Sequence, residues 1–157
     1  MNKKKTKIFI AGHKGMVGSA ILKKLKENNF KKIITVDKKK LNFINQAKTL
    51  KFISKIKPDI VIIAAAKVGG ITFNNLNRAQ FIYENTMINS NIIHSSYLNN
   101  VKKIIFLGSS CMYPKDCKQP MKEEYLLDGK FEPTNEPYAL AKMLGIKMCE
   151  SYNYQYK

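Results

Sequence analysis

Four side chains in two segments of the chain could carry out proton chemistry together. Ser109 and Cys111 lie in the stretch LGSSCMYP, residues 107–114, directly after a short apolar run. Tyr138 and Lys142 lie four positions apart in YALAK, so they share one face if that segment is helical. A cation beside a phenol lowers the phenol pKa, and a thiol ordinarily titrates near ~8.5. These four residues are our candidate catalytic set.

Members of this set also have ordinary explanations. A Tyr and a Lys four positions apart occur often by chance on an exposed helix face. A single cysteine is frequently a small buried hydrophobe. The residues alone therefore favour packing rather than chemistry as the role of Cys111.

A glycine-rich turn, GHKGMVG at residues 12–18, follows an apolar run and precedes a segment with helical spacing. Glycines let backbone N–H groups approach a pyrophosphate, and the start of the following helix adds partial positive charge. A strand, a glycine turn and a helix in succession are the context in which this pattern indicates a dinucleotide site. We expect cofactor contacts from Gly12, His13, Lys14, Gly15, Met16, Val17 and Gly18.

The residues at the end of the second apolar run determine whether the cofactor is NAD or NADP. Asp37 lies there, about twenty residues past the glycines, where an acid usually holds the ribose 2′-hydroxyl of NAD. Lys14, Lys38 and Lys39 could instead hold the 2′-phosphate of NADP. NADP is our prediction, and NAD is the alternative because of Asp37. Further cofactor contacts are expected from Ala65, Leu107, Gly108, Ser109, Ser110, Tyr138 and Lys142.

Short apolar runs alternate with segments of helical spacing along the chain. Strands are expected at residues 7–11, 33–36, 59–66 and 103–108. Helices are expected at residues 16–28, 45–56 and 79–98, and Pro137 is expected to open a last helix with Thr134 or Asn135 near its cap. Residues 67–77 are expected to form a loop.

This alternation predicts an α/β fold of the Rossmann type, a doubly wound parallel sheet. Residues 1–157 are expected to form one incomplete NAD(P)-binding domain. Ligands of such sheets bind outside the carboxyl ends of the strands, so the glycine turn, Asp37 and residues 107–114 are expected at one edge. The strand at 103–108 usually has neighbours on both sides, and its outer edge is expected to be unpaired here.

The net charge of +17 is concentrated in residues 1–60, which hold 17 lysines and three acidic residues. Such a bias can indicate nucleic-acid binding. However, Arg78 is the only arginine, and lysine, asparagine and isoleucine abound, as expected of an AT-rich genome. No basic motif interleaved with aromatic residues is present, so we expect no nucleic-acid partner.

The cysteines and the apolar runs indicate the compartment. Cys111, Cys117 and Cys149 form no C-x-x-C pair, which favours a reducing compartment, and no zinc spacing predicts a metal site. The first apolar run is too short for a signal peptide, and no run approaches the ~18 residues of a membrane span. We expect a cytoplasmic protein with no membrane partner.

Cys117, Cys149 and His94 are expected to be structural, and Lys67 either faces the cofactor or is solvated.

Several segments together resemble the extended short-chain dehydrogenase/reductase family. Ser109, Tyr138 and Lys142 follow a glycine-turn unit in the order that this family uses. The stretches GHKGMVGSAI, AAAKVGGI, FIYEN, LGSSCMYP, EPTNEPYALAK and CESYN are similar to a branch that acts on GDP-linked 4-keto sugars. The resemblance covers nearly the whole chain, and KVGG and SSC are its more specific marks.

The resemblance implies an NADPH-dependent 3,5-epimerase/4-reductase of GDP-4-keto-6-deoxy-D-mannose, a homodimer when complete. Cys111 would exchange protons at C3 and C5, the carbons next to the ketone. Tyr138 would protonate the C4 oxygen during reduction, and Lys142 would hold the nicotinamide ribose and lower the pKa of Tyr138. Ser109 would orient the carbonyl and stabilise developing negative charge.

Two departures from the family's pattern bear on these expectations. Lys14 stands where the family commonly has arginine, which weakens bidentate recognition of a phosphate. The family continues past the equivalent of Lys157 into a substrate-binding lobe with a histidine partner for the cysteine and the GDP contacts. We therefore expect a truncated or split gene product, inactive alone, with a C-terminal fragment as a complementing partner. The alternatives are another sugar-nucleotide epimerase or dehydratase of the family, or a non-catalytic nucleotide-binding remnant.

Overall fold

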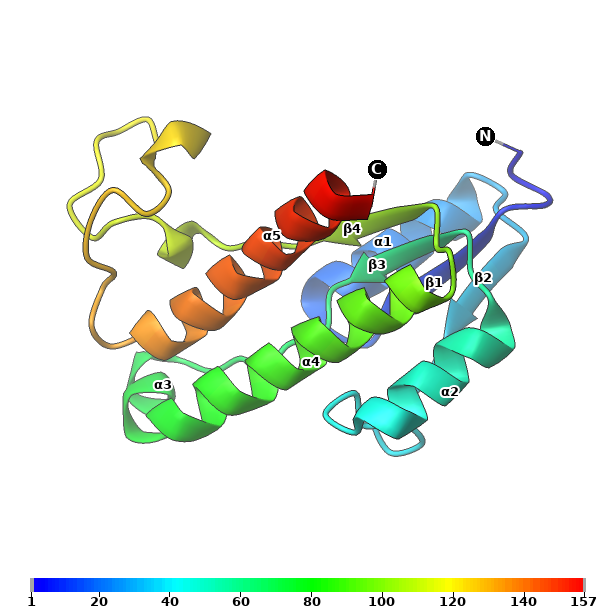
Figure 1. The fold of residues 1–157 in the computed structure, drawn as a ribbon, viewed down its shortest axis with the longest axis horizontal. Helices are drawn as coiled ribbons and strands as arrows, with labels where there is room; N and C mark the ends of the chain where they lie inside the picture. The colour runs from blue at the N-terminus through cyan, green and yellow to red at the C-terminus, as the bar shows by residue number, and fades with distance from the viewer. Residues whose placement is uncertain (1, 157) are drawn as a thin grey trace. The chain divides into compact units, whose positions relative to one another are not determined.

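The computed structural model describes residues 2–156, which divide into two compact units. The first unit runs to Ala66 and resumes over Met87–Leu107, and it contains the sheet. The second comprises Lys67–Thr86 and the residues from Gly108 onward, and it contains the candidate catalytic set. The long helix α4 (Arg78–Leu98) supplies residues to both units (Figure 1).

Four parallel strands form the sheet of the first unit, in the order β2-β1-β3-β4. Their bounds are β1 (Lys7–Ala11), β2 (Lys32–Thr35), β3 (Ile60–Ile63) and β4 (Lys103–Phe106). In the register, Ile8 of β1 lies opposite Ile33 of β2 and Ile60 of β3. Among the described strands β4 pairs only with β3, so the predicted parallel sheet and the unpaired outer edge of β4 are confirmed.

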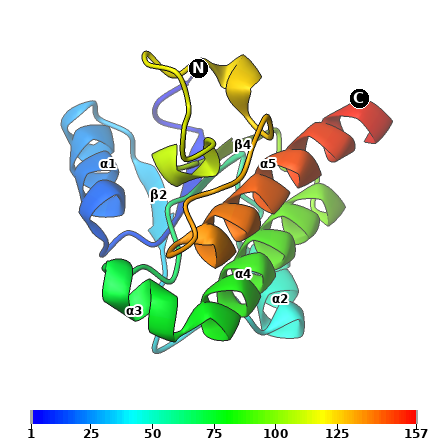
Figure 2. The same cartoon turned by 90° about the vertical axis from the view of Figure 1, so that its left-hand side faces the viewer.

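Helices cover both faces of this sheet, which explains why its inner strands are continuously apolar. The helices of the first unit are α1 (Met16–Glu27), α2 (Gln46–Ile56) and the second part of α4. Leu22 of α1 packs against an apolar cluster to which Ile8 and Ile10 of β1 belong. Phe9 of the same strand points the other way, edge-on to Phe52 of α2 with ring centroids 5.3 Å apart. Figure 2 shows α1 and α2 on opposite sides of the strands.

The ends of α2 show how local chemistry sets an element's bounds. The side chain of Asn45 accepts a hydrogen bond from the backbone N–H of Lys48 at 2.9 Å, which caps the first turn. Lys57 ends the helix in the left-handed region, at a φ of 44°, immediately before Pro58. A proline cannot continue a helix and restricts the residue before it, so the end is sharp.

The second unit contains the shorter elements around the first part of α4. They are α3 (Ile71–Leu76), the 3-10 turns η1 (Ser110–Met112) and η2 (Glu123–Tyr125), and the long helix α5 (Glu136–Tyr156). The prediction that residues 67–77 form a loop is wrong, because α3 lies within them. The side-chain amide of Asn74 donates to the carbonyls of Gly69 and Gly70, at 2.8 and 3.3 Å, and holds this short helix together.

The other predicted elements are confirmed with small shifts at their ends. The third and fourth strands stop at Ile63 and Phe106, earlier than predicted, and α5 begins one residue before Pro137. No helix within residues 2–156 is long and apolar enough to cross a membrane.

Candidate active site

The glycine turn joins β1 to α1 in the first unit, and its geometry depends on missing side chains. Gly12 has a φ of +90°, and a Cβ there would lie 2.6 Å from the backbone nitrogen of Ala65. A Cβ on Gly18 would lie only 2.1 Å from the carbonyl oxygen of Gly12. The backbone of the turn is thus packed against itself and against the residues that follow β3, including the predicted cofactor residue Ala65.

The same turn fits a dinucleotide pyrophosphate. Gly15 precedes α1 with no side-chain hydrogen bond capping the helix, and the first turn of α1 carries no acidic residue. Met16, the next residue, is 87% exposed, so the start of the helix is open. Uncapped N–H groups and the positive end of the helix dipole favour a phosphate at this position.

Replacing Gly18 by alanine is expected to lower the melting temperature of the chain by roughly 10 °C. The added methyl group would overlap the carbonyl oxygen of Gly12. That oxygen belongs to the backbone, so no side-chain rotation can relieve the overlap. Gly15→Ala is the matched control, because its Cβ would lie 3.4 Å from the same oxygen and its backbone is extended. Thermal unfolding followed by circular dichroism compares the two, and equal melting temperatures would refute this account of the turn.

Asp37 follows β2 and is engaged by residues of the glycine turn. Its Oδ1 lies 2.7 Å from Nζ of Lys14 and 3.6 Å from Nε2 of His13. The hydrogen bond from Lys14 is the largest cause that holds the pKa of Asp37 below its ordinary value. Lys38 is exposed beside it. The carboxylate that would serve NAD is therefore paired with a cation in this structure.

Ser109 and Cys111 are brought together in the second unit by the 3-10 turn η1. Ser109 precedes the turn, and its carbonyl accepts the N–H of Met112 at 3.2 Å. This places the Cys111 thiol 3.1 Å from the Ser109 hydroxyl, to which it donates a hydrogen bond. Both side chains are half-buried, whereas Ser110 between them is exposed.

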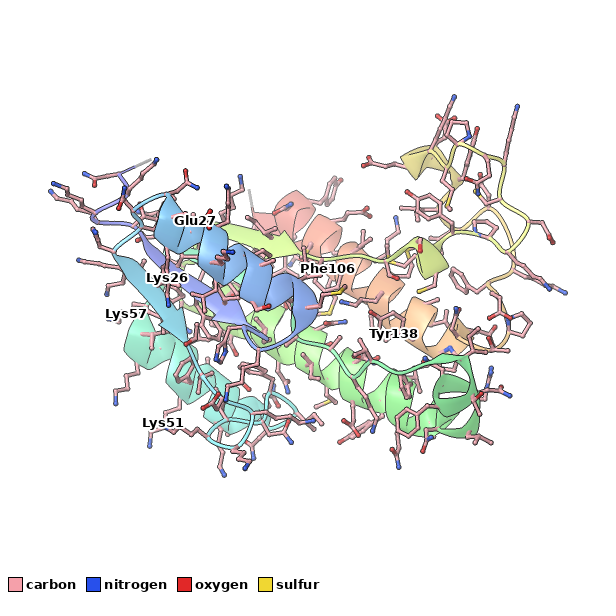
Figure 3. All side chains as sticks on the ribbon, turned by 180° about the vertical axis from the view of Figure 1, so that it is seen from behind. Lys26, Glu27, Lys51, Lys57, Phe106 and Tyr138 are labelled. Carbon is pink, nitrogen blue, oxygen red and sulfur yellow. The ribbon has the colours of Figure 1, made fainter. Side chains whose placement is uncertain are left out.

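Tyr138 and Lys142 share one face of α5, as their spacing predicts. Tyr138 lies at the start of the helix (Figure 3). Lys142 is only 3% exposed, and its ammonium lies 5.9 Å from the centroid of the Tyr138 ring. A lysine is rarely buried without a function or a partner, so this pair stands apart from the exposed lysines of the chain.

Burial controls the ionisation of Tyr138 and Lys142. Burial is the main cause that raises the pKa of Tyr138, and the nearby Cys111 raises this pKa further. The prediction that Lys142 lowers the pKa of Tyr138 is therefore wrong, because desolvation of the phenol dominates. Burial also lowers the pKa of Lys142. The phenol stays protonated at neutral pH, which is the state that a proton donor needs.

Burial likewise raises the pKa of Cys111, but two neighbours act in the opposite direction. The hydrogen bond with Ser109 and the charge of Lys142 both favour the thiolate. The thiol, the hydroxyl, the phenol and the ammonium thus influence one another within one unit. Cys117 and Cys149 carry free thiols and take no part in this cluster.

The sequence did not reveal the residues that hold the start of α5. Arg78 donates to the carbonyl of Pro133 at 2.5 Å and to the carboxylate of Glu136 at 2.8 Å, two residues before Tyr138. The carbonyl of Asn135 accepts the N–H groups of Tyr138 and Ala139, which starts the helix. The available signal was compositional: a single arginine in a lysine-rich chain marks a place where a planar, bidentate donor is needed.

A second group that the sequence did not reveal fixes the segment after β3. Asn85 of α4 is fully buried, and its side chain accepts the N–H of Lys67 at 2.7 Å and donates to the Lys67 carbonyl at 3.0 Å. The Lys67 ammonium lies 2.6 Å from Glu84, so this ion pair keeps it from being free in solvent or available to a cofactor. The signal was the unusually polar composition of α4, although the partner could not be read from it.

The predicted site residues thus fall into two sets, each assembled within its own unit. The first unit holds the glycine turn with Asp37, Lys38, Ala65 and Leu107. The second holds Gly108, Ser110 and the candidate catalytic set. Within residues 2–156 no group of three or more His, Cys, Asp or Glu side chains is placed to hold a metal ion.

Known proteins with similar sequences are sugar-nucleotide enzymes. The chain is 53% identical over 152 residues to the GDP-L-fucose synthase of Escherichia coli (strain K12) and 51% identical over 156 residues to GDP-L-fucose synthase 1 of Arabidopsis thaliana. These matches cover 97% and 99% of the chain but 47% and 48% of the two relatives. The chain therefore spans about half the length of the curated relatives it matches.

Solved structures agree with the fold. A GDP-mannoheptose C4 reductase from Campylobacter jejuni with NADP bound is 44% identical and superimposes with a TM-score of 0.95 over 99% of this chain and 49% of that one. A GDP-L-fucose synthetase from Naegleria fowleri bound to NADP is 27% identical, with a TM-score of 0.88 over 97% of this chain and 45% of that one.

A protein-family model also matches nearly the whole chain. The model described as the NAD dependent epimerase/dehydratase family matches residues 8–157, which include the glycine turn, Ser109, Cys111, Tyr138 and Lys142. The chain belongs to the NAD dependent epimerase/dehydratase family.

Proposed function

We propose that this chain carries the cofactor-binding and reducing part of a GDP-L-fucose synthase, which converts GDP-4-keto-6-deoxy-D-mannose to GDP-L-fucose. The observation that carries the proposal is the cluster in the second unit. A buried lysine beside a phenol and a thiol hydrogen-bonded to a serine are held on α5 and η1. The sequence identities of 53% and 51% to the GDP-L-fucose synthases named above support the same substrate.

In the reduction, Tyr138 is the proton donor. Its raised pKa keeps the phenol protonated, so it can give its proton to the C4 oxygen as that oxygen becomes an alkoxide. Ser109 donates a hydrogen bond to the same oxygen and stabilises the developing charge. Lys142, buried beside Tyr138, is placed to stabilise the phenolate that remains. NADPH, when bound, supplies the hydride.

In the epimerisation, Cys111 exchanges protons at C3 and C5. Only these carbons are next to the C4 ketone, so only their protons are acidic enough to leave. Burial raises the pKa of Cys111, and the Ser109 hydrogen bond and the Lys142 charge offset part of that effect. Inverting a centre also needs a second acid or base on the opposite face, which we place outside these 157 residues.

The glycine turn and the residues around Asp37 would hold NADP rather than NAD. Lys14 pairs with Asp37 at 2.7 Å and so neutralises the carboxylate that would otherwise repel a 2′-phosphate. Lys14 and Lys38 are both exposed, so their ammonium groups are accessible to an anion. The relatives solved with NADP or NADPH support the same choice.

NADPH is therefore expected to bind this chain more tightly than NADH, and Lys14→Ala is expected to reduce the preference by about tenfold. The substitution removes a cation from the phosphate and frees Asp37 for a ribose hydroxyl. Titration of the cofactors' fluorescence gives both dissociation constants. Lys24→Ala, an exposed lysine of α1 paired with Glu27, is the matched control. Tighter binding of NADH to the unsubstituted chain would show that Asp37 governs the pocket.

A chimera that joins residues 1–157 to the remaining part of the Escherichia coli relative tests the proposed reaction. Incubation with GDP-4-keto-6-deoxy-D-mannose and NADPH is expected to form GDP-L-fucose, while the 157 residues alone form none. A chimera that folds and binds NADPH but forms no product would overturn the assignment.

A second candidate is a C4 reductase of GDP-linked heptoses without epimerisation. Its support is the 44% identity to the Campylobacter jejuni GDP-mannoheptose C4 reductase, close to the values for the fucose enzymes. Tyr138, Lys142 and Ser109 would serve both reactions equally. Cys111 distinguishes them, because a reductase has no proton to exchange at C3 or C5.

We further propose that the two units act as one cofactor-binding domain in a cytoplasmic homodimer, completed by a C-terminal part. Three free thiols fit a reducing compartment. The unpaired outer edge of β4 offers backbone groups that a further strand can pair with.

A further inference from the structure

We propose that Ser109 is a two-position switch, whose hydroxyl can donate to the substrate oxygen only while Cys111 is a thiol. The inference rests on the proposed function and adds an order to its two reactions. It assigns Ser109 a role in proton exchange as well as in reduction.

The geometry of the pair carries this inference. The Cys111 thiol donates to the Ser109 hydroxyl oxygen across 3.1 Å. A serine hydroxyl has one proton and two lone pairs, so while it accepts from the thiol its own proton remains free to bind another acceptor. A thiolate has no proton and can only accept, and a charged acceptor outcompetes a neutral carbonyl for the one serine proton. The state of Cys111 therefore decides where the serine proton points.

The groups that face Cys111 are consistent with this coupling. From α5, the Lys142 cation favours the thiolate, and Cys111 disfavours the ionisation of Tyr138. Burial opposes the thiolate, and the Ser109 hydrogen bond offsets part of that cost. The Ser109 hydrogen bond is thus the largest of the causes that favour the charged sulfur.

The proton balance of epimerisation makes use of such a switch. When the thiolate takes a proton from C3 or C5, a C–H bond breaks, an S–H bond forms, and the electron pair moves to the C4 oxygen as an enolate. The serine proton, released by the sulfur at that moment, becomes available to the enolate oxygen. Inversion is completed when a second acid on the opposite face gives carbon a proton and the electron pair returns from the C4 oxygen to carbon. When the thiol then loses its proton to solvent, the charge and the serine proton go back to the sulfur. Reduction needs the serine proton on the C4 oxygen, so it proceeds only from the thiol state.

The test uses the 157-residue chain with Cys117→Ser and Cys149→Ser, which leaves Cys111 as the one thiol. Ultraviolet absorbance of the thiolate is followed against pH. Ser109→Ala is expected to raise the pKa of Cys111 by about one unit, which is roughly tenfold less thiolate near neutrality. Ser109→Thr, which keeps a hydroxyl, is expected to stay near the parent value.

The infrared S–H stretch reports the other position of the switch. In the thiol state, Ser109→Ala is expected to move this band to higher frequency, because the sulfur loses its acceptor. Ser110→Ala, an exposed neighbour, is the matched control and is expected to change neither readout. Circular dichroism confirms that each variant is folded.

An unchanged midpoint or an unchanged stretch in Ser109→Ala would overturn the proposal. So would the same two changes in Ser109→Thr, because that variant keeps the hydroxyl. Neither readout needs substrate or cofactor. Failure of the switch is therefore distinguishable from failure of the proposed function, which appears only in the product assay of the chimera.

Discussion

Tyr138→Phe is expected to lower the rate of C4 reduction in the chimera by roughly 10²–10⁴-fold, the usual contribution of a positioned proton donor. The phenylalanine keeps the ring over which the Lys142 ammonium lies but removes the only proton that Tyr138 can give. Proton exchange at C3 and C5 should continue, because Cys111 and Ser109 are untouched. Oxidation of NADPH measures reduction, and solvent deuterium entering unreduced substrate measures exchange.

Tyr152→Phe is the matched control for this experiment. It makes the same substitution further along α5, away from Ser109 and Cys111. Its reduction rate should stay near that of the parent chimera. Reduction that survives Tyr138→Phe within a few-fold would show that another group protonates the C4 oxygen.

Cys111→Ser is expected to have the opposite pattern, with proton exchange at C3 and C5 lowered by roughly 10²–10⁴-fold. A serine hydroxyl fills the same place beside Ser109 but does not ionise near neutral pH, so it can neither take nor return a proton at carbon. Reduction of the unepimerised ketone should persist, since Tyr138 and Lys142 remain. Mass spectrometry of substrate incubated in deuterium oxide measures the exchange.

Cys117→Ser is the control for Cys111→Ser, because it changes a free thiol elsewhere in the same unit. It should exchange protons at the parent rate. If Cys111→Ser also exchanges at the parent rate, Cys111 is a structural residue, which is the interpretation that its spacing alone favours.

Elements whose burial depends on their own pattern could be predicted from the sequence. The third strand reads as a continuous apolar run, and its four residues are all buried between two helical layers. The glycine turn was recognisable because its steric demand is local: a Cβ on Gly18 collides with Gly12, six residues away. By contrast, α3 was missed because two glycines and several asparagines read as a loop. It is held by the Asn74 amide and by Phe73 packing edge-on to Phe81, a contact that spacing does not reveal.

The site shows the same division between local and distant causes. The spacing of Tyr138 and Lys142 correctly places them on one helix face, but the direction of the Tyr138 pKa shift depends on how deeply the fold buries the phenol. The pairing of Lys67 with Glu84 and of Arg78 with Glu136 joins residues 17 and 58 positions apart. Such pairs require the tertiary arrangement within the second unit, and a single sequence carries no record of them.

Solvent-deuterium labelling of the product tests the central claim most directly. The chimera is incubated with GDP-4-keto-6-deoxy-D-mannose and NADPH in deuterium oxide, and the nucleotide sugar is analysed by mass spectrometry and NMR. We expect GDP-L-fucose with deuterium at both C3 and C5, because Cys111 takes part in proton exchange at both centres before Tyr138 completes the reduction. A reduced product that carries no deuterium at either carbon would identify a C4 reductase and contradict the assignment of epimerisation to this chain.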